Sequence, residues 1–260
     1  MYRMIIRKTP EQVDRMAAAG EILVRCLRML ESKARPGTTT AQLDEAAERF
    51  IRSQDAEPAF KGYRGFPGSI CASPNSMVVH GIPGPYELKR GDLLSIDVGV
   101  TLDGYVADSA ITVTIGDPAP DAAELIDACN LGLKAAIEQC REGRRLGDVS
   151  HAVQEVVEAR GFGVVRSLVG HGVGRSMHED PQIPNYGPPG RGPKLAAGMV
   201  FAIEPMITAG SWGVVSGDDG WAVYTDDASL AAHIEHTVAV TSNGPRVLTR
   251  REPKGQGEGR

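Results

Sequence analysis

Apolar residues recur every three or four positions in four segments of the chain, the spacing expected of one buried helix face. The first segment opens with Thr9 and Pro10, a helix start signal, and ends at Pro36 and Gly37. The other three segments are residues 38–54, 121–140 and 146–160. We therefore expect two pairs of helices, one pair in each half of the chain.

A second pattern follows each pair of helices, where Val, Ile and Thr become frequent and Gly and Pro separate the runs. It covers residues 69–115 and returns after the fourth helix, up to about Thr241. Short runs of β-branched residues with such punctuation predict strands. The order helix, helix, strands thus occurs twice, which favours a duplicated α+β fold.

Short motifs in the two halves can be aligned residue by residue. Residues 88–97, LKRGDLLSID, match residues 195–204, LAAGMVFAIE, so that Asp97 and Glu204 are counterparts. Further matches give two more pairs: Asp108 with Glu235, and His80 with His171. We expect a single domain over residues 1–248, with halves at about 9–116 and 117–248 and the site between them. Residues 249–260 end in a run without apolar side chains and are expected to be a flexible tail.

Composition and charge narrow the classes of function. The 260 residues are 42% hydrophobic and carry a formal net charge of −5, so a basic field for nucleic acid or anionic membrane is not expected. The longest apolar runs fall short of the roughly 20 residues of a membrane span. The four cysteines show no CxxC spacing, and no signal-like segment opens the chain. These features predict reduced, buried thiols and a cytoplasmic location.

Geometry brings the first two carboxylates together. Asp103 and Gly104 form the dipeptide preferred in a two-residue hairpin turn. With that turn, Asp97 lies opposite Ala110, and Asp108 lies on the same face one diagonal step away, about 7–8 Å between backbones. A single Asp at a strand end usually makes local hydrogen bonds. Two converging carboxylates instead repel, and a cation between them removes the repulsion.

The repeat adds further ligands to this pair. The full set contains four carboxylates and one imidazole: Asp97, Asp108, Glu204, Glu235 and His171. Such a set suits two hard or borderline divalent ions, Mn, Fe, Co or Zn, rather than a thiolate zinc site. Paired ions of this kind serve hydrolases, including aminopeptidases. Hydrolysis is the leading functional hypothesis.

The histidines other than His80 divide into two groups. His171 and His178 are seven residues apart, but the glycines after His171 favour a strand end or loop over a helix. His151, His233 and His236 are expected to be structural. His233 shares a strand face with Glu235, so it could support a ligand, although a solvated strand edge is the favoured interpretation.

Five segments resemble the type I methionine aminopeptidases of bacteria, and the similarity runs from about Ile6 to Leu248. The segments are VVHGIP, SIDVGVTLDGYVADSA, GHGVGRSMHEDPQIPNYG, GMVFAIEPMI and HIEHTVAVT. The resemblance implies the pita-bread fold, an antiparallel sheet with two pairs of helices related by a pseudo-two-fold axis. It also implies removal of the initiator methionine from nascent polypeptides whose second residue is small.

The same resemblance implies roles for individual residues. Asp97, Asp108, His171, Glu204 and Glu235 match the metal ligands, and Glu204 also matches the residue that carries the proton of the attacking water. His178 matches the residue that stabilises the tetrahedral intermediate, and His80 matches the one that contacts the scissile amide nitrogen. The methionine pocket corresponds to Tyr63, Phe66, Cys71, Met177 and Trp221. Met177 and Phe60 depart from the residues common in relatives.

Two alternatives stay open, another peptidase of the same fold and a protein of a different class. An Xaa-Pro aminopeptidase or prolidase shares the five ligands but carries an additional N-terminal domain, whereas only about ten residues precede the first helix here. A non-catalytic binding protein of the same fold would have lost ligands, and here all are present. The short span between His178 and Glu204 leaves no room for the type II insertion, and no N-terminal zinc-binding extension is expected. The resemblance suggests a monomer and allows a monovalent cation near Asn75, whereas contact with the ribosome stays open.

Overall fold

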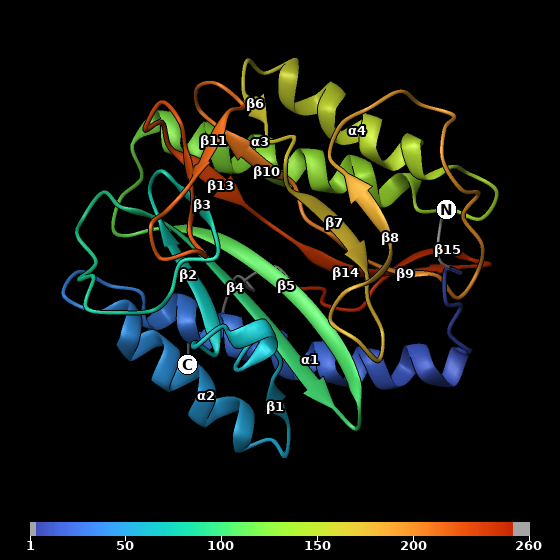
Figure 1. Cartoon of the computed structure of the whole chain (residues 1–260), viewed down its shortest axis with the longest axis horizontal. Coiled ribbons are helices and arrows are strands. Elements are labelled where there is room, and N and C mark those ends of the chain that lie inside the picture. Colours follow the sequence, from blue (N-terminus) through green and yellow to red (C-terminus); the bar gives the residue numbers. More distant parts are fainter. Residues whose placement is uncertain (1–3, 252–260) are drawn as a thin grey trace, which may run out of the picture.

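The computed structural model describes residues 4–251 and confirms both predicted pairs of helices (Figure 1). The helices are α1 (Pro10–Lys33), α2 (Thr40–Arg52), α3 (Pro120–Gln139) and α4 (Leu146–Glu158). Thr9 caps α1 as predicted: its hydroxyl accepts a hydrogen bond from the Gln12 backbone, and the Gln12 side chain accepts one from the Thr9 backbone.

The strands form one larger antiparallel sheet in each half of the molecule. The first contains β1 (Glu57–Pro58), β2 (Ile70–Pro74), β4 (Leu93–Leu102) and β5 (Tyr105–Thr114). The second contains β7 (Val169–Gly172), β8 (Glu179–Pro184), β9 (Val200–Ile203), β14 (His236–Thr241) and β15 (Gly244–Val247). The sequence predicts strands only up to about Thr241 and misses β15, because Pro245 argues against a strand. The proline is tolerated there since β15 is an edge strand.

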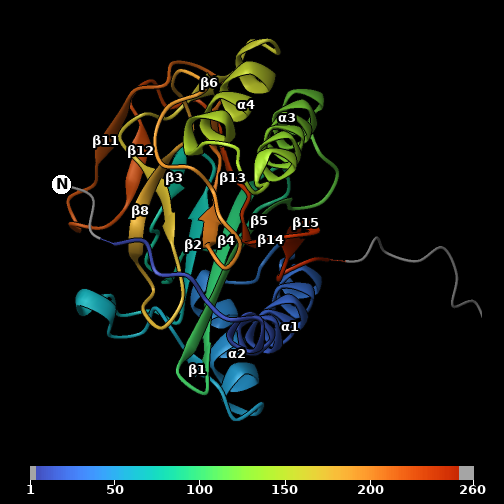
Figure 2. The same cartoon turned by 90° about the vertical axis from the view of Figure 1, so that its right-hand side faces the viewer.

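Smaller sheets complete the fold among the described residues. One contains β6 (Gly163–Val164), β10 (Met206–Thr208) and β13 (Ala231–His233). The other contains β3 (Met77–Val79), β11 (Val214–Ser216) and β12 (Val223–Thr225). In the side view, α1 and α3 lie on one side of the large strands and the sheet of β3, β11 and β12 lies on the other (Figure 2).

Each half has its own apolar core. Leu23, Leu27 and Leu30 of α1 pack with Ile96 and Val98 of β4 in the first core. In the second, side chains of α3 and α4 pack with β9 and β14. The duplicated fold expected from the motif repeat is thus reflected in two separate cores.

The two halves join along β5 and the segment before β14. The Ser109 hydroxyl donates to the Glu235 carbonyl, and the Glu235 amide donates to the Ala110 carbonyl. The Thr237 hydroxyl accepts from the Asp108 amide at 2.9 Å and donates to the Asp108 carbonyl at 2.7 Å. This seam fixes Asp108 of one half beside Glu235 of the other.

The packed part of the chain extends past the predicted boundary at residue 248. Thr249 is buried and its hydroxyl bonds to His236 Nδ1 and to the Thr237 amide. Residues 252–260 of the predicted tail lie outside the described residues. Between residues 4 and 251, no helix combines the length and apolar character that a membrane crossing demands.

Candidate active site

The predicted hairpin is present with the predicted register. Asp103 and Gly104 form the turn between β4 and β5, Asp97 pairs with Ala110, and Gly99 pairs with Asp108. Asp97 and Asp108 therefore lie on the same face of the hairpin, as expected from the alternation of side chains. The ladder on both sides of these residues holds the two carboxylates in place.

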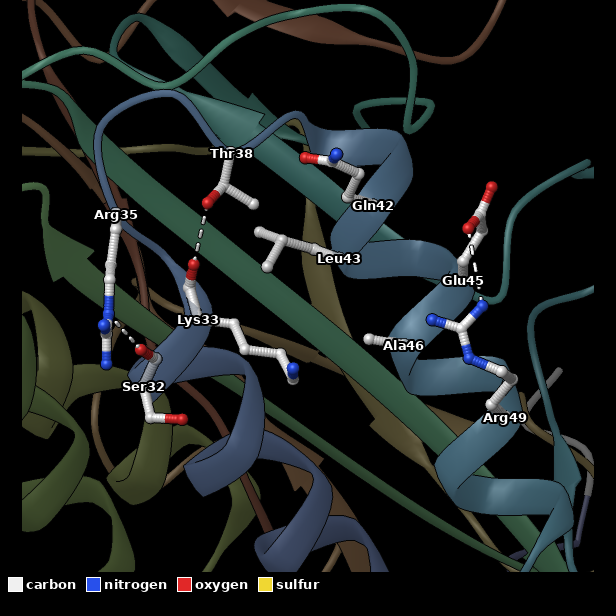
Figure 3. A pocket seen from close by; sticks show the side chains of 9 residues that line it. All are labelled: Ser32, Lys33, Arg35, Thr38, Gln42, Leu43, Glu45, Ala46 and Arg49. Carbon is white, nitrogen blue, oxygen red and sulfur yellow. Dashed lines mark hydrogen bonds and ion pairs between the residues drawn. The ribbon is translucent and has the colours of Figure 1, made fainter.

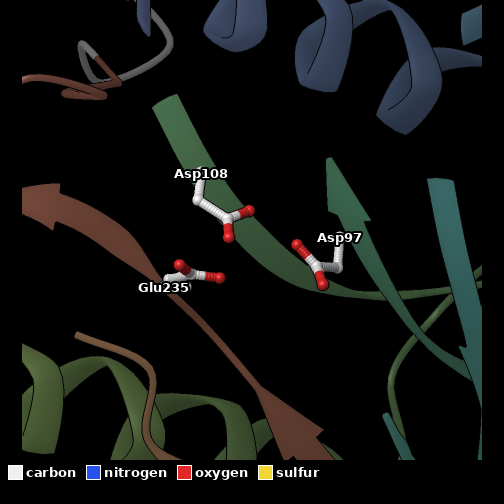
Figure 4. A group of neighbouring side chains, drawn as sticks. All are labelled: Asp97, Asp108 and Glu235. Carbon is white, nitrogen blue, oxygen red and sulfur yellow. The ribbon is translucent and has the colours of Figure 1, made fainter. Parts of the chain in front are cut away.

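A third carboxylate converges on this pair from the other half of the molecule. One oxygen each from Asp97, Asp108 and Glu235 can be chosen so that all lie within 4.8 Å of one another. Figure 4 shows the three carboxylates turned toward a common space, from β4, from β5 and from the segment that precedes β14. Asp108 and Glu235 are buried, with exposed fractions of 4% and 1%.

Glu204 and His171 complete the set that the sequence predicts. His171 lies at the end of β7, the strand end expected from its glycine neighbours, and its Nε2 is 3.5 Å from Glu204 Oε1 and 3.7 Å from Asp108 Oδ2. Its Nδ1 donates to the Gly172 carbonyl at 2.9 Å. Because Nδ1 carries the proton, the lone pair of Nε2 faces the carboxylates. Gly172 is required here, since a Cβ would lie 2.3 Å from the Asp180 carbonyl oxygen.

The electrostatics of the cluster favour a bound cation. Burial, and then the mutual repulsion of neighbouring carboxylates, raise the pKa of Asp97, Glu204 and Glu235. Burial likewise raises the pKa of Asp108 and lowers that of His171 to about 4, so the imidazole is neutral near pH 7. Divalent metals bind neutral imidazole and ionised carboxylate, so a bound cation would offset the burial and repulsion that raise the pKa of these carboxyl groups.

Unsatisfied atoms in the cluster provide an independent test of that fit. Asp97 Oδ1, Asp108 Oδ1 and Glu235 Oε1 are buried without a hydrogen-bond partner among the described residues. Buried carboxylate oxygens are rarely left in this state, because their desolvation is then uncompensated. Divalent cations between these oxygens would satisfy them, so the residues present fit a metal site.

His233 is a part of the site that the sequence interpretation missed. It was expected at a solvated strand edge, yet it is 2% exposed, and its Nε2 lies 3.8 Å from Glu204 Oε2 and 3.7 Å from Glu235 Oε2. Burial lowers the pKa of His233 to about 3, which keeps the ring neutral. The shared strand face with Glu235 was a correct signal, but the pairing of β13 with β10 that buries this face is not visible in the sequence. His151 and His236 instead bond to the Gly187 carbonyl and to Thr249.

The carboxylates form the floor of a cavity of about 280 Å³. Its walls include most of the predicted methionine pocket, namely Tyr63, Phe66, Cys71 and Trp221. Phe66 and Trp221 meet edge to face, with ring centroids 5.1 Å apart, and bring the two halves together over the cavity. Phe60, expected to affect the shape of the pocket, also lines it, and sequence reasoning did not assign several other wall residues: Arg64, Val79, Ser167, Leu168, Val169 and Met206.

Met177 lies behind this wall rather than among the residues that line the cavity. It is 4% exposed and packs with Phe60 over Gly99, where even a Cβ would lie 2.6 Å from the Met177 methyl group. The adjacent His178 points the other way and is exposed. Met177 therefore shapes the pocket indirectly, through the position of Phe60.

Two further predicted histidines line the same cavity, His80 and His178. The His178 ring stacks on Tyr63, with centroids 5.3 Å apart, and its Nδ1 is 2.9 Å from the Tyr63 hydroxyl. The ring centroid of His178 is 4.1 Å from that of His171. His80 follows β3 with φ of 61°, a conformation uncommon outside glycine.

Other features of the chain lie away from this cluster. A groove of about 620 Å³ between the end of α1 and α2 is lined by exposed polar side chains such as Lys33, Arg35 and Arg49 (Figure 3). Asn75, near which a monovalent cation was expected, accepts from the Leu93 amide and donates to Asp92, and its carbonyl accepts from Ala231. That cation remains a prediction.

Comparison with known proteins decides which family this site belongs to. The model of metallopeptidase family M24 matches residues 14–242. The methionine aminopeptidase of Clostridium perfringens is 52% identical over 95% of this chain and 99% of its own length. The chain belongs to family M24, among the methionine aminopeptidases. The crystal structure of a methionine aminopeptidase from Thermotoga maritima superposes with a TM-score of 0.93 at 44% identity, covering 95% of this chain and 100% of that one.

The prolidase alternative is less well supported. A prolidase from Pyrococcus furiosus shares the fold with a TM-score of 0.79 but only 25% identity, and the match covers 96% of this chain and 66% of that protein. A methionine aminopeptidase of this family is a metallo-exopeptidase, so the chain is a hydrolase that needs divalent metal. The pita-bread fold predicted from the motifs is confirmed by these neighbours.

Removing one carboxylate from the cluster should change stability in opposite ways with and without metal. In chelator, Asp97→Asn should melt at the same temperature as the wild-type protein or above it, because repulsion between buried carboxylates is relieved. In saturating Mn²⁺ it should melt below the wild-type protein, because a ligand has been lost and less binding energy favours the folded state. Thermal melts in both buffers measure this. Asp103→Asn, in the turn of the same hairpin, is the matched control and should follow the wild-type protein in both.

Proposed function

We propose that this chain releases the N-terminal methionine of newly made polypeptides by a two-metal hydrolysis, when the second residue is small. The observation that carries the proposal is the placement of a buried cluster of carboxylates and one imidazole at the floor of a small cavity with aromatic walls. A floor that holds cations and a wall that holds a thioether are the two requirements of this reaction.

The metal-binding part of the proposal assigns five residues of the chain. Asp97, Asp108, His171, Glu204 and Glu235 would hold two divalent ions, of Mn, Fe, Co or Zn. When bound, such ions polarise a carbonyl and lower the pKa of water enough to form a nucleophile near neutral pH. Glu204 would accept the proton of the attacking water and pass it to the leaving amine. Its place is fixed from behind, since Asn185 Nδ2 donates to the Glu204 carbonyl at 2.9 Å.

Two histidines would contact the peptide itself. If the Tyr63 hydroxyl donates to His178 Nδ1, then Nε2 carries the proton and can donate to the oxygen that becomes negative in the transition state. His80 would contact the scissile amide nitrogen from its place in the cavity wall. Tyr63, Phe66, Cys71 and Trp221 would enclose the methionine side chain, whose sulfur packs well against aromatic edges. Met177 would act from behind Phe60.

The remaining expectations belong to the same proposal. The two halves would act as one catalytic domain, because each supplies ligands to the same cluster. The substrates would be nascent polypeptide N-termini, which places the activity in the cytoplasm, where contact with the ribosome would bring the enzyme to its substrate. The resemblance to the bacterial enzymes suggests a monomer, and we propose that state.

The activity is tested with peptides that differ at one position. With Mn²⁺ or Co²⁺ added, Met-Ala-Ser should be hydrolysed at least about a hundredfold faster than Met-Leu-Ser and than an Ala-Pro peptide, as judged by kcat/KM from amine release. A closed pocket next to the scissile bond gives this preference. Chelator should abolish the reaction. Faster release from the Xaa-Pro peptide would instead establish the prolidase alternative, and no release from any peptide would favour a binding protein.

Metal content and turnover should separate His171 from His178. His171→Ala should lose bound metal and recover part of its activity at high metal concentration. His178→Ala should keep its metal, while kcat falls by roughly a hundred- to a thousandfold, the usual effect of deleting one donor to an oxyanion. Metal titration by calorimetry alongside steady-state kinetics makes the comparison. Equal loss of metal in both variants would show that His178 is also a ligand.

His233 should act on the metal site through the two glutamates that it faces. His233→Leu keeps an apolar side chain in the buried space but removes the ring nitrogen next to Glu204 and Glu235. Metal affinity should fall by about ten- to a hundredfold, the range seen when a partner of a metal ligand is removed. The matched control is His236→Leu, the same change at a half-buried histidine on the next strand along the chain, and its metal affinity should stay within about twofold of the wild-type value. An unchanged affinity for His233→Leu would leave His233 as packing only.

A further inference from the structure

A buried ion pair joins the segment before the first helix to the residue that follows His178. Lys8 Nζ lies 2.6 Å from Glu179 Oε2, and the two side chains are only 5% and 7% exposed. Charged side chains are rarely buried this deeply unless they are paired, and their desolvation offsets much of the attraction between them. Neither residue lines the cavity, so the pair takes no direct part in the proposed chemistry.

Glu179 uses its other oxygen to hold the loop that carries His178. Glu179 Oε1 accepts from the Arg175 amide at 2.9 Å and from the Ser176 amide at 3.4 Å. Gly174 passes directly over the ion pair, where a Cβ would lie 2.5 Å from both Lys8 Cε and Glu179 Oε1. The loop from residue 173 to 178 is thus packed onto the ion pair and bonded to it.

The same loop is fixed on its other side to the hairpin that carries the metal ligands. The Val106 amide donates to the Gly174 carbonyl at 2.8 Å, and the Arg175 guanidinium donates to the Tyr105 hydroxyl at 2.9 Å. Lys8 is itself anchored, because its amide donates to the Gly198 carbonyl at 2.6 Å, next to the strand that leads to Glu204. The loop is therefore bonded directly to the hairpin that carries Asp97 and Asp108. Through Lys8, the ion pair also ties the loop to the strand that leads to Glu204.

His178 is the residue whose position depends on this connection. Its side chain is exposed, and its contacts are the Tyr63 ring and hydroxyl and the His171 ring. An exposed ring with few packing contacts takes its place from its backbone. The backbone here is fixed by the hydrogen bonds that Glu179 accepts, and Lys8 fixes Glu179.

We propose that Lys8 and Glu179 are positioning residues for His178: the buried ion pair holds the loop so that the His178 ring faces the reacting carbonyl. The inference rests on the proposed role of His178 and extends it to the segment before α1. The pair acts on turnover rather than on metal binding, because neither residue touches the carboxylate cluster.

The first variant removes the charge of Lys8 but keeps much of its length. In Lys8→Met, the Glu179 carboxylate is left buried without its partner and should leave its place, taking the loop with it. kcat on Met-Ala-Ser should fall by about ten- to a hundredfold, the range expected when a catalytic group is displaced by about 1 Å. Metal affinity by calorimetry should stay within about twofold of the wild-type value, and KM within about threefold, because ligands and pocket are untouched.

The same change in a His178→Ala background distinguishes positioning from general damage. If Lys8 acts through His178, Lys8→Met should lower kcat of His178→Ala by less than about twofold, since the group to be positioned is gone. Arg90→Met is the matched control, because it breaks an exposed ion pair with Asp117 and should leave kcat unchanged in both backgrounds. An equal loss of kcat from Lys8→Met in both backgrounds, or no loss in the wild-type background, would overturn the inference. Full activity of His178→Ala alone would instead refute the proposed role of His178.

A second variant keeps the test decisive if Lys8→Met folds poorly in thermal melts. Glu179→Gln removes the charge on the other side but retains an oxygen that accepts from Arg175 and Ser176. It should lower kcat less than Lys8→Met does and show the same dependence on His178. The double variant Lys8→Met with Glu179→Gln leaves no buried charge, and it should recover kcat relative to Lys8→Met alone. If the loss of kcat in the double variant equals the product of the two single losses, the two residues do not act as a unit and the inference is contradicted.

Discussion

The repulsion between buried carboxylates is the constraint on which the rest of this structure depends. Asp97, Asp108 and Glu235 offer oxygens within 4.8 Å of one another, and burial and mutual repulsion oppose their ionisation. Side chains alone would relieve this by turning away. They do not, because Asp97 and Asp108 lie on neighbouring strands of a continuous ladder, and Glu235 is bonded through its own backbone to that ladder. The backbone thus imposes an arrangement whose repulsion bound cations would relieve.

Duplication of the fold explains why the carboxylates of the two halves are arranged almost symmetrically. The histidines at matching positions break this symmetry. Each half supplies two carboxylates at matching positions, and the seam along β5 brings the two pairs together. The matching histidines have diverged. His171 Nε2 is 3.5 Å from Glu204, among the carboxylates, whereas His80 lies in the cavity wall. Matching positions in the two halves therefore place one histidine among the carboxylates and the other in the cavity wall.

The sequence predicts those parts of the site whose geometry is local. The turn at Asp103 and Gly104 fixes the register of its hairpin, and that register alone places Asp97 beside Asp108. Parts that depend on contacts between distant segments were missed. Burial of His233 requires β13 to pair with β10, and the place of Met177 behind the cavity wall requires β4 to pass beneath the loop. Neither pairing leaves a periodic signal in the residues concerned.

Residues of the site that lie on strands and residues that lie on loops are held in place in different ways. The proposed metal ligands lie on strands or directly beside them, so the hydrogen bonds of the sheets contribute to holding their backbone in place. Three residues of the cavity wall, Tyr63, His178 and Trp221, lie outside the strands and keep their places through contacts with one another and with distant segments. A loop built in this way needs an anchor of its own. The Lys8–Glu179 pair has the burial and the hydrogen bonds of such an anchor, which makes the segment before the first helix a structural part of the active site.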